Sequence, residues 1–288
     1  MCPPLQSRAR VANTTMIETL ATVESNRELA PGYRLLTLKL KEDVKVSPGQ
    51  FAMLKAHASI EPLLRRAFAV YRVHGPRRLS FLYQVLGRGT EALSQVEQEG
   101  TVDALLPLGN SWPIEGSANR RAIVVAGGIG SASVLMLCEG LAASHVDVQL
   151  FFGAASAHAA AGCGLADFRS LGLSLAVTTD DGSLGERGFV TAPFERSLRD
   201  GGDAGATIYA CGPWVMMRRV AEIASQFEVR CLVSLEAPMG CGFGVCVGCV
   251  VAVKTGGPLG YDSYVRVCTD GSIFPAERIR WDVNAMTH

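Results

Sequence analysis

The sequence has no excess of charge of either sign, because 27 Lys and Arg balance 27 Asp and Glu over 288 residues. Proteins that bind nucleic acid normally carry a basic excess or stripe, so this balance argues against that class. No apolar run reaches the ~18 residues needed to cross a bilayer. The first fifteen residues lack an apolar stretch of the signal-peptide type, and we expect them to form a frayed extension. A soluble, cytoplasmic protein without membrane attachment is the expectation.

The composition supplies enough apolar material for more than one buried core. Apolar residues make up 48% of the chain and charged residues only 19%, which argues against disorder. The length corresponds to about two domains at roughly 150 residues each. The chain has no internal repeat and no low-complexity linker, but its pattern changes near residues 116 and 235. We therefore divide it into residues 16–116, 117–235 and 236–288.

Residues 16–116 have the pattern of an all-β domain. Four short segments rich in aliphatic and aromatic residues indicate strands, and Pro-Gly or Gly-Pro pairs punctuate them. These segments are YRLLTLKL (33–40), FAMLKAH (51–57), RAFAVYRV (66–73) and LSFLYQVL (79–86). Regular short strands with turn signals are typical of a barrel or a sandwich. One helix is expected from Thr90 to Glu97.

Residues 117–235 alternate between strand-like and helix-like segments. The expected strands are AIVVAG (122–127), VDVQLFFGA (146–154), LSLAVTTD (173–180) and ATIYACG (206–212). The expected helices are SASVLMLCEGL, AHAAAGCGLADF and PWVMMRRVAEIA, which follow the first, second and fourth of these strands. Such alternation predicts a parallel sheet covered by helices on both faces.

Nine cysteines are present, an odd number that is unevenly spread and does not suggest a disulfide framework. In a cytosolic chain, clustered cysteines more often bind metal or take part in catalysis. Four residues separate Cys241 from Cys246, two separate Cys246 from Cys249, and eighteen separate Cys249 from Cys268. This is the plant-type [2Fe–2S] spacing, in which four thiolates hold two irons.

Glycines interleave these cysteines, and they let the backbone curl around an inorganic core so that N–H groups approach the sulfurs. A zinc tetrathiolate usually comes from two Cys-x-x-Cys pairs, whereas this region has one. Zinc, a redox-active dithiol and unliganded buried cysteines remain the alternatives to the [2Fe–2S] cluster.

Two strand-to-helix junctions in residues 117–235 have features of a dinucleotide site. Gly127, Gly128 and Gly130 follow a strand and precede a helix, a place where backbone can approach a pyrophosphate. The pattern departs from the strict Gly-x-Gly-x-x-Gly motif because position 133 is Ser. The second junction is Cys-Gly-Pro at 211–213, at the carboxyl end of a strand, although a buried small residue is the favoured interpretation of Cys211 taken alone.

The barrel region also has features that suit an anion. Arg65 and Arg66 precede an apolar strand, where they could contact a phosphate or simply be solvated. Gly87, Gly89 and Thr90 stand at the start of a short helix. The alternative is a plain capped turn with Thr90 as the N-cap.

Taken together, these motifs resemble the ferredoxin–NADP reductase superfamily. Within it the chain is similar to the electron-transfer subunits of class 1B dihydroorotate dehydrogenase. The resemblance covers roughly residues 17–281, and its most specific parts are SLEAPMGCGFGVCVGC and YVRVCTDGSIF. It implies an N-terminal antiparallel β-barrel that binds FAD, a parallel α/β domain that binds NAD, and a small C-terminal domain that binds a [2Fe–2S] cluster.

The resemblance also implies roles for individual residues. The Arg-x-Phe/Tyr-Ser motif that binds FAD would be Arg66, Ala67, Phe68 and Ala69, where Ala69 replaces the serine and removes one hydroxyl contact. The other implied cofactor contacts lie beside the flavin (Tyr83, Val85), at its phosphates (Gly89, Thr90), at the NAD pyrophosphate (Gly127, Gly128, Gly130) and beside the nicotinamide (Cys211, Gly212, Pro213). The implied cluster ligands are Cys241, Cys246, Cys249 and Cys268. The stretch 179–191 is expected to close over the dinucleotide.

NAD is favoured over NADP on physical grounds. An NADP site needs a cation for the 2′-phosphate, and residues 153–168 contain no Lys or Arg. His158 is the one candidate cation there, and a solvated loop histidine is the better interpretation.

The function that the resemblance implies is an electron relay between NAD, FAD and the cluster. The relay connects to an FMN-containing catalytic subunit that oxidises dihydroorotate to orotate, in a heterotetramer of two chains of each kind. This chain would need no catalytic acid or base. Two alternatives remain: an NAD(P)H-dependent reductase that serves a ferredoxin, a hydrogenase or an oxygenase, and a redox-sensing flavoprotein without turnover. An exposed apolar patch is expected around Val245 and Val247.

Overall fold

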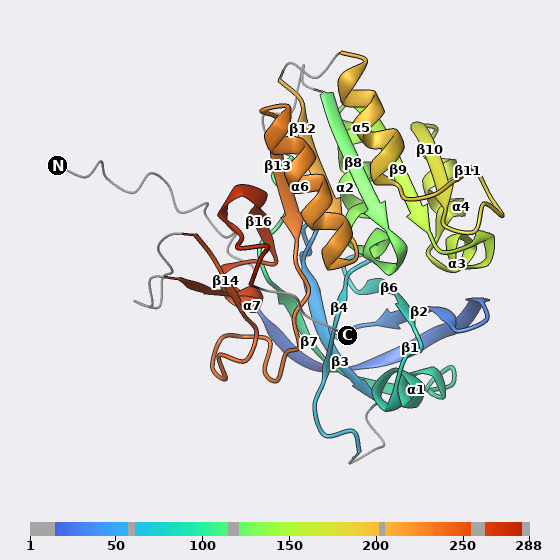
Figure 1. The fold of residues 1–288 in the computed structure, drawn as a ribbon. Helices are drawn as coiled ribbons and strands as arrows, with labels where there is room; N and C mark the ends of the chain where they lie inside the picture. The colour runs from blue at the N-terminus through green and yellow to red at the C-terminus, as the bar shows by residue number, and fades with distance from the viewer. Residues whose placement is uncertain (1–14, 57–60, 115–120, 202–204, 255–262, 284–288) are drawn as a thin grey trace.

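A computed structural model describes residues 15–56, 61–114, 121–201, 205–254 and 263–283. The expected frayed extension falls almost entirely outside these residues, and so does the expected boundary near residue 116. The described residues form two seven-stranded sheets and one two-stranded sheet. Figure 1 shows that the two large sheets belong to separate lobes.

The first sheet is antiparallel, with the strand order β4-β3-β7-β1-β2-β6-β5. Its strands are β1 (Ile17–Ala30), β2 (Tyr33–Lys39), β3 (Phe51–Ala56), β4 (Arg66–Ala69), β5 (Arg72–Gly75), β6 (Arg78–Gln84) and β7 (Thr101–Leu108). Alternate residues of these strands point to one enclosed core; on β6 these are Leu79, Phe81 and Tyr83. The expectation that this region is an all-β domain is therefore confirmed.

The connection between β4 and β5 joins the two edges of this sheet. The N–H of Val70 donates to the carbonyl of Gln50 beside β3 (3.0 Å), and the N–H of Tyr71 donates to the carbonyl of Ser80 on β6 (2.9 Å). The sheet thus curls into a barrel. The run 66–73, expected as one strand, is two strands because the chain turns this corner.

The second sheet has the order β11-β10-β9-β8-β12-β13-β16. Its strands are β8 (Arg121–Gly127), β9 (Asp147–Ala154), β10 (Ser174–Thr179), β11 (Glu186–Arg187), β12 (Thr207–Cys211), β13 (Arg230–Ser234) and β16 (Ile273–Pro275). The pairings are parallel, as expected, except that β16 joins β13 in the antiparallel direction. A segment from the C-terminal region therefore completes the edge of this sheet.

Helices cover both faces of the second sheet, which confirms that prediction. The side chains on one face of β8, including Val124, pack with α2 (Ser131–Ala143), α3 (Ala157–Gly162) and α4 (Leu165–Ser170). The alternate set, including Val125, packs with α5 (Thr191–Arg199) and α6 (Trp214–Gln226). Among the described residues, no helix is both long and apolar enough to cross a membrane.

Two expected helices have different limits in the structure. The segment 157–168, expected as one helix, is divided into α3 and α4 because Gly164 adopts φ +77°, a left-handed conformation that ends the first helix. The helix of the barrel domain, α1, spans Arg88–Ser94 and not Thr90–Glu97, and its N-cap is Gly87.

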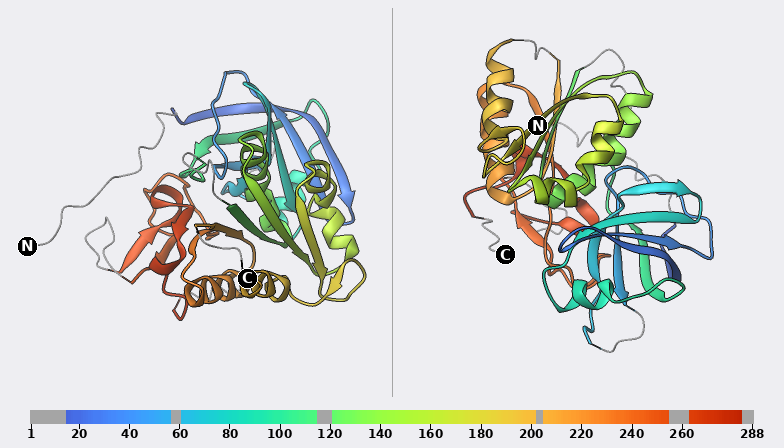
Figure 2. Two further views of the ribbon diagram at one scale, coloured as in Figure 1. Left: turned by 90° about the horizontal axis from the view of Figure 1, so that it is seen from above. Right: turned by 90° about the vertical axis from the view of Figure 1, so that its right-hand side faces the viewer.

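The C-terminal segment lies against both lobes, as Figures 1 and 2 show. It contains β14 (Val250–Ala252), β15 (Tyr264–Arg266), α7 (Val267–Asp270), strand β16 and the short 3-10 helix η2 (Ala276–Arg278). Residues 241–249, which we call the cysteine loop, precede β14. This loop touches the barrel at Gly242, where an added Cβ would lie 2.5 Å from Met53 Cγ. Cys249 and Cys268 belong to one apolar cluster with Met53 and Leu108 of the barrel.

Candidate functional site

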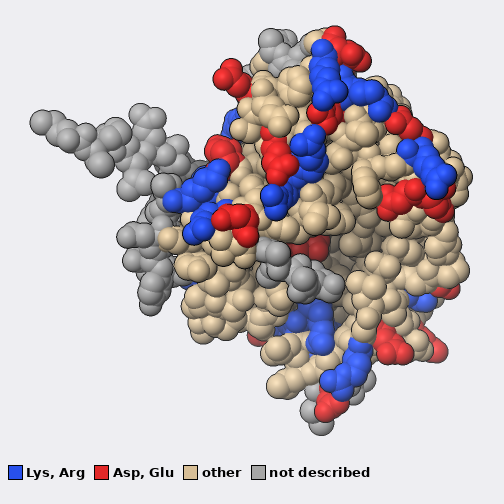
Figure 3. Space-filling model, viewed as in Figure 1, with Lys and Arg blue, Asp and Glu red and all other residues tan. Residues whose placement is uncertain are grey.

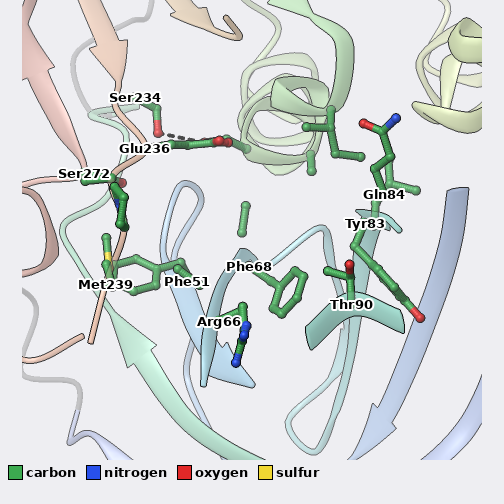
Figure 4. A pocket seen from close by; sticks show the side chains of 18 of the residues that line it. Phe51, Arg66, Phe68, Tyr83, Gln84, Thr90, Ser234, Glu236, Met239 and Ser272 are labelled. Carbon is green, nitrogen blue, oxygen red and sulfur yellow. Dashed lines mark hydrogen bonds between the residues drawn. The ribbon is translucent and has the colours of Figure 1, made fainter. Parts of the chain in front are cut away.

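A cavity of about 600 Å³ lies between the barrel, the start of α2 and the segment that follows β13. In the close view of Figure 4, the barrel side presents Arg66, Phe68 and Thr90. The opposite side presents Ser234, Glu236, Met239 and Ser272. Ligands of open α/β sheets bind beyond the carboxyl ends of the strands, and β13 ends here. The cavity is therefore the candidate cofactor site.

The barrel wall of the cavity contains most of the expected FAD residues. The expected residues that line it are Arg66, Ala67, Phe68, Ala69, Tyr83 and Thr90. The rings of Phe68 and Tyr83 meet edge to face at 5.7 Å between centroids. Val85 is not among the lining residues; it lies just beyond β6, where its N–H donates to the carbonyl of Gly32 (2.8 Å).

The two adjacent arginines have different surroundings. Arg65 forms a salt bridge with Asp103 (2.8 Å) and a second one with Glu18, so its charge is compensated by carboxylates of the barrel domain. Arg66 donates to the carbonyl of Leu64 and lies along Gly89, where an added Cβ would be 2.2 Å from Arg66 Nε. The absent side chain of Gly89 therefore leaves room for the guanidinium of Arg66 at the cavity.

Thr90 stabilises the turn before α1, but it is not the N-cap that one interpretation of the sequence suggested. It is the third residue of the helix, and its hydroxyl accepts the N–H groups of Leu86 (2.9 Å) and Gly87 (3.2 Å) while donating to the Gly87 carbonyl (3.0 Å). The hydroxyl thus holds the glycine turn beside the cavity.

The glycine turns after β8 and β12 are in direct backbone contact. A Cβ on Gly130 would lie 2.6 Å from Gly212 Cα, and one on Gly127 would lie 3.0 Å from Pro213 Cδ. Gly128, with φ +54°, has no heavy atom within 4 Å of its Cβ position among the described residues. Glycine is therefore needed for the close approach of the two turns, and the open side of Gly128 leaves room for a ligand.

Sequence analysis did not identify the polar groups on the far wall of the cavity. The hydroxyl of Ser133, on α2, donates to that of Ser234, at the end of β13 (3.1 Å), and both residues are buried. Cys211 lies behind them, and burial raises the pKa of its thiol. The only sequence signal was that Ser234 and Glu236 follow an apolar strand directly.

The four expected ligand cysteines form two pairs. The thiols of Cys241 and Cys246 are in contact, and so are those of Cys249 and Cys268. Within the described part of the chain, no three His, Cys, Asp or Glu side chains converge on a point suited to a single metal ion. Two thiol pairs are the arrangement that a two-iron cluster requires, with two sulfur ligands on each iron.

Backbone N–H groups point at these sulfurs. The N–H of Cys246 donates to Cys241 Sγ, that of Gly248 to Cys246 Sγ, and that of Cys268 to Cys249 Sγ, each at 3.5 Å. Burial alone would raise the pKa of Cys241, but the surrounding N–H groups outweigh it and lower it to about 7. The Cys268 thiol lowers the pKa of Cys249 to about 6 and has its own pKa raised, so the two share a proton. The donors favour thiolates, the form that binds iron.

The fold and the site together define a flavin- and pyridine-nucleotide-dependent oxidoreductase with an iron–sulfur domain. The dihydroorotate dehydrogenase B (NAD(+)) electron transfer subunit of Geobacillus kaustophilus is 38% identical over 263 residues, which cover 90% of this chain and 96% of that protein. Its counterpart in Caldanaerobacter subterraneus is 35% identical over 260 residues, covering 90% and 97%. This chain belongs to the family of dihydroorotate dehydrogenase B (NAD(+)) electron transfer subunits.

The family model of the iron-sulfur cluster binding domain of dihydroorotate dehydrogenase B matches residues 236–280. Among solved structures, the NADH-dependent reduced ferredoxin-NADP oxidoreductase studied for electron bifurcation has a TM-score of 0.79 and 25% identity, covering 91% of this chain and 90% of that one. Phthalate dioxygenase reductase has a TM-score of 0.63 and 16% identity, covering 88% and 94%, and supports the fold alone.

Proposed function

We propose that this protein relays electrons between NAD, FAD and a [2Fe–2S] cluster, and exchanges them with an FMN-containing dihydroorotate dehydrogenase catalytic subunit in pyrimidine biosynthesis. The observation that carries the proposal is the pairing of four cysteine thiols, three from the loop 241–249 and one from α7, in a region packed on the barrel of a reductase fold. The functional units are residues 16–116 for FAD, 117–235 for NAD and 236–288 for the cluster.

The proposed FAD site is the cavity wall of the barrel. Arg66 offers a cation for the pyrophosphate, with Gly89 and Thr90 beside it, and Phe68 offers aromatic surface, with the buried ring of Tyr83 packed edge to face behind it. Ala67, Ala69 and Val85 complete the proposed contacts. Ala69 brings no hydroxyl, whereas the buried Ser133 and Ser234 on the other wall do.

The proposed NAD site is the pair of glycine turns at the carboxyl ends of β8 and β12. Gly127, Gly128 and Gly130 would face the pyrophosphate, and Cys211, Gly212 and Pro213 the nicotinamide. At the end of β10, Asp180 N–H donates to the Ala154 carbonyl (3.1 Å), which brings the stretch 179–191 to the same edge of the sheet. This position supports its role as a cover for the dinucleotide.

The bound groups supply the chemistry: a hydride passes between NAD and FAD, and single electrons pass between FAD and the cluster. The residues of this chain would bind these groups and orient them so that electrons can pass from one to the next. No residue is assigned as a catalytic acid or base, because the pyrimidine reacts on the other subunit.

The proposed contact with the catalytic subunit is the cysteine loop. Its apolar side chains Phe243, Val245 and Val247 are exposed, Val245 at 73%, as the sequence predicted. In Figure 3 the surface over this loop carries few charged side chains, while charges of both signs alternate over the upper lobe. An exposed apolar patch of this kind is typical of a surface that binds another protein, and a bound subunit would exclude water from the region around the cluster. We propose a heterotetramer of two chains of each kind, located in the cytoplasm.

The direct test is anaerobic purification followed by analysis of iron, acid-labile sulfide and FAD. We expect two irons and two sulfides per chain, about one FAD, and reduction of both centres by NADH. Added catalytic subunit should then give NADH-dependent reduction of orotate. Absence of iron and sulfide, or zinc in their place, would refute the proposal.

A second candidate is a reductase that serves a ferredoxin, and the TM-score of 0.79 with a ferredoxin-NADP oxidoreductase favours it. It predicts fast NADH-dependent reduction of ferredoxin and none of orotate when the catalytic subunit is present. The variant Val245→Asp should slow electron transfer to the physiological acceptor, either ferredoxin or the catalytic subunit, and leave transfer to the other unchanged. Leu63→Asp, at an equally exposed position, is the control and should slow neither.

A further inference from the structure

Arg266 lies beside the cysteine loop and is fixed on two sides. Its Nε and Nη2 donate to the two carboxylate oxygens of Asp270, at 3.3 and 3.4 Å. Its Nη1 donates to the carbonyl of Gly244, in the loop between Cys241 and Cys246 (3.3 Å). The guanidinium therefore connects α7 to the loop that carries two of the four sulfurs.

The ion pair lies on either side of Cys268 in the sequence. Arg266 is the last residue of β15, and Asp270 is the last residue of α7. The carboxylate of Asp270 also accepts the backbone N–H of Arg266 (2.8 Å). The side chains of Arg266 and Asp270 are 23% and 16% exposed, so solvent screens their charges only in part. Cys268 lies between these two residues, and its N–H donates to Cys249 Sγ (3.5 Å), so the ion pair stands next to two of the expected ligands.

Gly244 is the point at which the loop touches this pair. Its φ is +90°, and an added Cβ would lie 2.9 Å from Thr269 Cγ2 and 3.1 Å from Arg266 Nη1. A side chain at this position would push the loop away from α7. Holding Gly244 thus fixes the position of the loop between Cys241 and Cys246.

We propose that Arg266 and Asp270 together set the reduction potential of the [2Fe–2S] cluster, with Arg266 also positioning the loop through Gly244. The inference rests on the proposed function, since it requires that the four cysteines hold the cluster. Reduction adds one electron to the cluster, so a nearby positive charge favours the reduced state and a nearby negative charge opposes it. Neither residue is a ligand; both act on the centre from outside its sulfur shell.

The pair predicts potential shifts of opposite sign. Arg266→Gln leaves the carboxylate of Asp270 uncompensated, so the potential should fall. Asp270→Asn leaves the guanidinium uncompensated, so the potential should rise. We expect about a tenfold change in the ratio of reduced to oxidised cluster in each case, which is about 59 mV for a one-electron couple. Arg266→Lys keeps the charge and should stay near the wild-type potential.

The experiment is an anaerobic redox titration of the full-length holoprotein, in which electron paramagnetic resonance reports the reduced cluster. Arg218→Gln is the matched control, because Arg218 also forms an i,i+4 pair, with Glu222 at 2.9 Å, on α6. It should leave the potential unchanged. Iron and sulfide analysis of each variant shows whether the cluster is loaded.

Shifts of the same sign in Arg266→Gln and Asp270→Asn, or no shift in either, would overturn the inference. So would a shift in Arg266→Lys as large as that in Arg266→Gln. If Arg266→Gln fails to load the cluster, the decision rests on Asp270→Asn, which must raise the potential. A wild-type protein without iron and sulfide would instead refute the proposed function, so the two failures are distinguishable.

Discussion

The barrel and the α/β lobe are joined by a polar contact that should control electron entry. Arg72 of β5 donates from Nε to Glu139 of α2 (2.7 Å) and from Nη1 to Asp167 of α4 (3.1 Å). The hydroxyl of Tyr71 donates to the same Asp167 carboxylate (2.6 Å). These bonds join the barrel to the helices that follow β8 and β9, so they hold the proposed FAD and NAD sites in a fixed relation to each other. We predict that Arg72→Gln impairs the reduction of FAD by NADH.

The magnitude follows from the surroundings of the two ion pairs. Their side chains are 26–31% exposed. A hydrogen bond to a charged group contributes about 1.5–3 kcal/mol when buried, and an exposed ion pair below about 1 kcal/mol. Two partly buried pairs should therefore contribute about 2 kcal/mol to the docking of the lobes. Because about 1.4 kcal/mol is a factor of ten, about 2 kcal/mol corresponds to about thirtyfold, and we expect the rate constant at saturating NADH to fall by about this factor.

The assay is anaerobic stopped-flow mixing of the holoprotein with NADH, followed by flavin absorbance. The dissociation constant of FAD should change less than about twofold, since the ion pairs lie outside the proposed FAD contacts. Reduction by dithionite, which needs no nicotinamide site, should be unaffected. Arg77→Gln is the control, because Arg77 forms an exposed ion pair with Asp43, which belongs to the same domain. Equal NADH rates in the two variants would refute the reasoning.

Three further outcomes test the cofactor sites. Ala69→Ser adds a hydroxyl to the cavity wall and should tighten FAD binding by about fivefold, the equivalent of one hydrogen bond of about 1 kcal/mol; fluorescence titration of the apoprotein measures it. Gly130→Ala should abolish flavin reduction by NADH while FAD is retained, because its Cβ would lie 2.6 Å from Gly212 Cα. After removal of the cluster, iodoacetamide should label Cys241 increasingly as pH rises through about 7, its lowered pKa. Cys211, buried and with a raised pKa, should stay unlabelled until the protein unfolds, as peptide mass spectrometry would show.

Local spacing in the sequence was sufficient for the parts of the site built from one short segment. The intervals between Cys241, Cys246 and Cys249 fix which sulfurs a tight loop can bring together. The glycines after β8 likewise predicted a turn at the carboxyl end of a strand, and the alternation of strands and helices predicted a parallel sheet. Periods and spacings within one segment are set by backbone geometry alone, so they can be deduced without the fold.

Only the tertiary structure decided which distant residues meet. Arg65 and Arg66 are neighbours of the same type and both line the cavity, but Asp103 of β7 pairs with Arg65, whereas the guanidinium of Arg66 lies along Gly89. Ser133 and Ser234 are 101 residues apart in the chain. They meet because β13 lies beside β12 and its end faces the start of α2.

The same distinction applies to the limits of the elements and to the C-terminal region. The sequence marked residues 236–288 as separate, yet the backbone of β16 pairs with β13 and completes the sheet of the α/β lobe. Strand order and the packing of lobes depend on contacts between segments far apart, and the composition of any one segment does not encode them. The sequence thus determined which chemical groups this protein has and how they are spaced within each segment. The order of the strands in the sheets, which is a property of the tertiary structure, determined which of these groups face each other across the cavity.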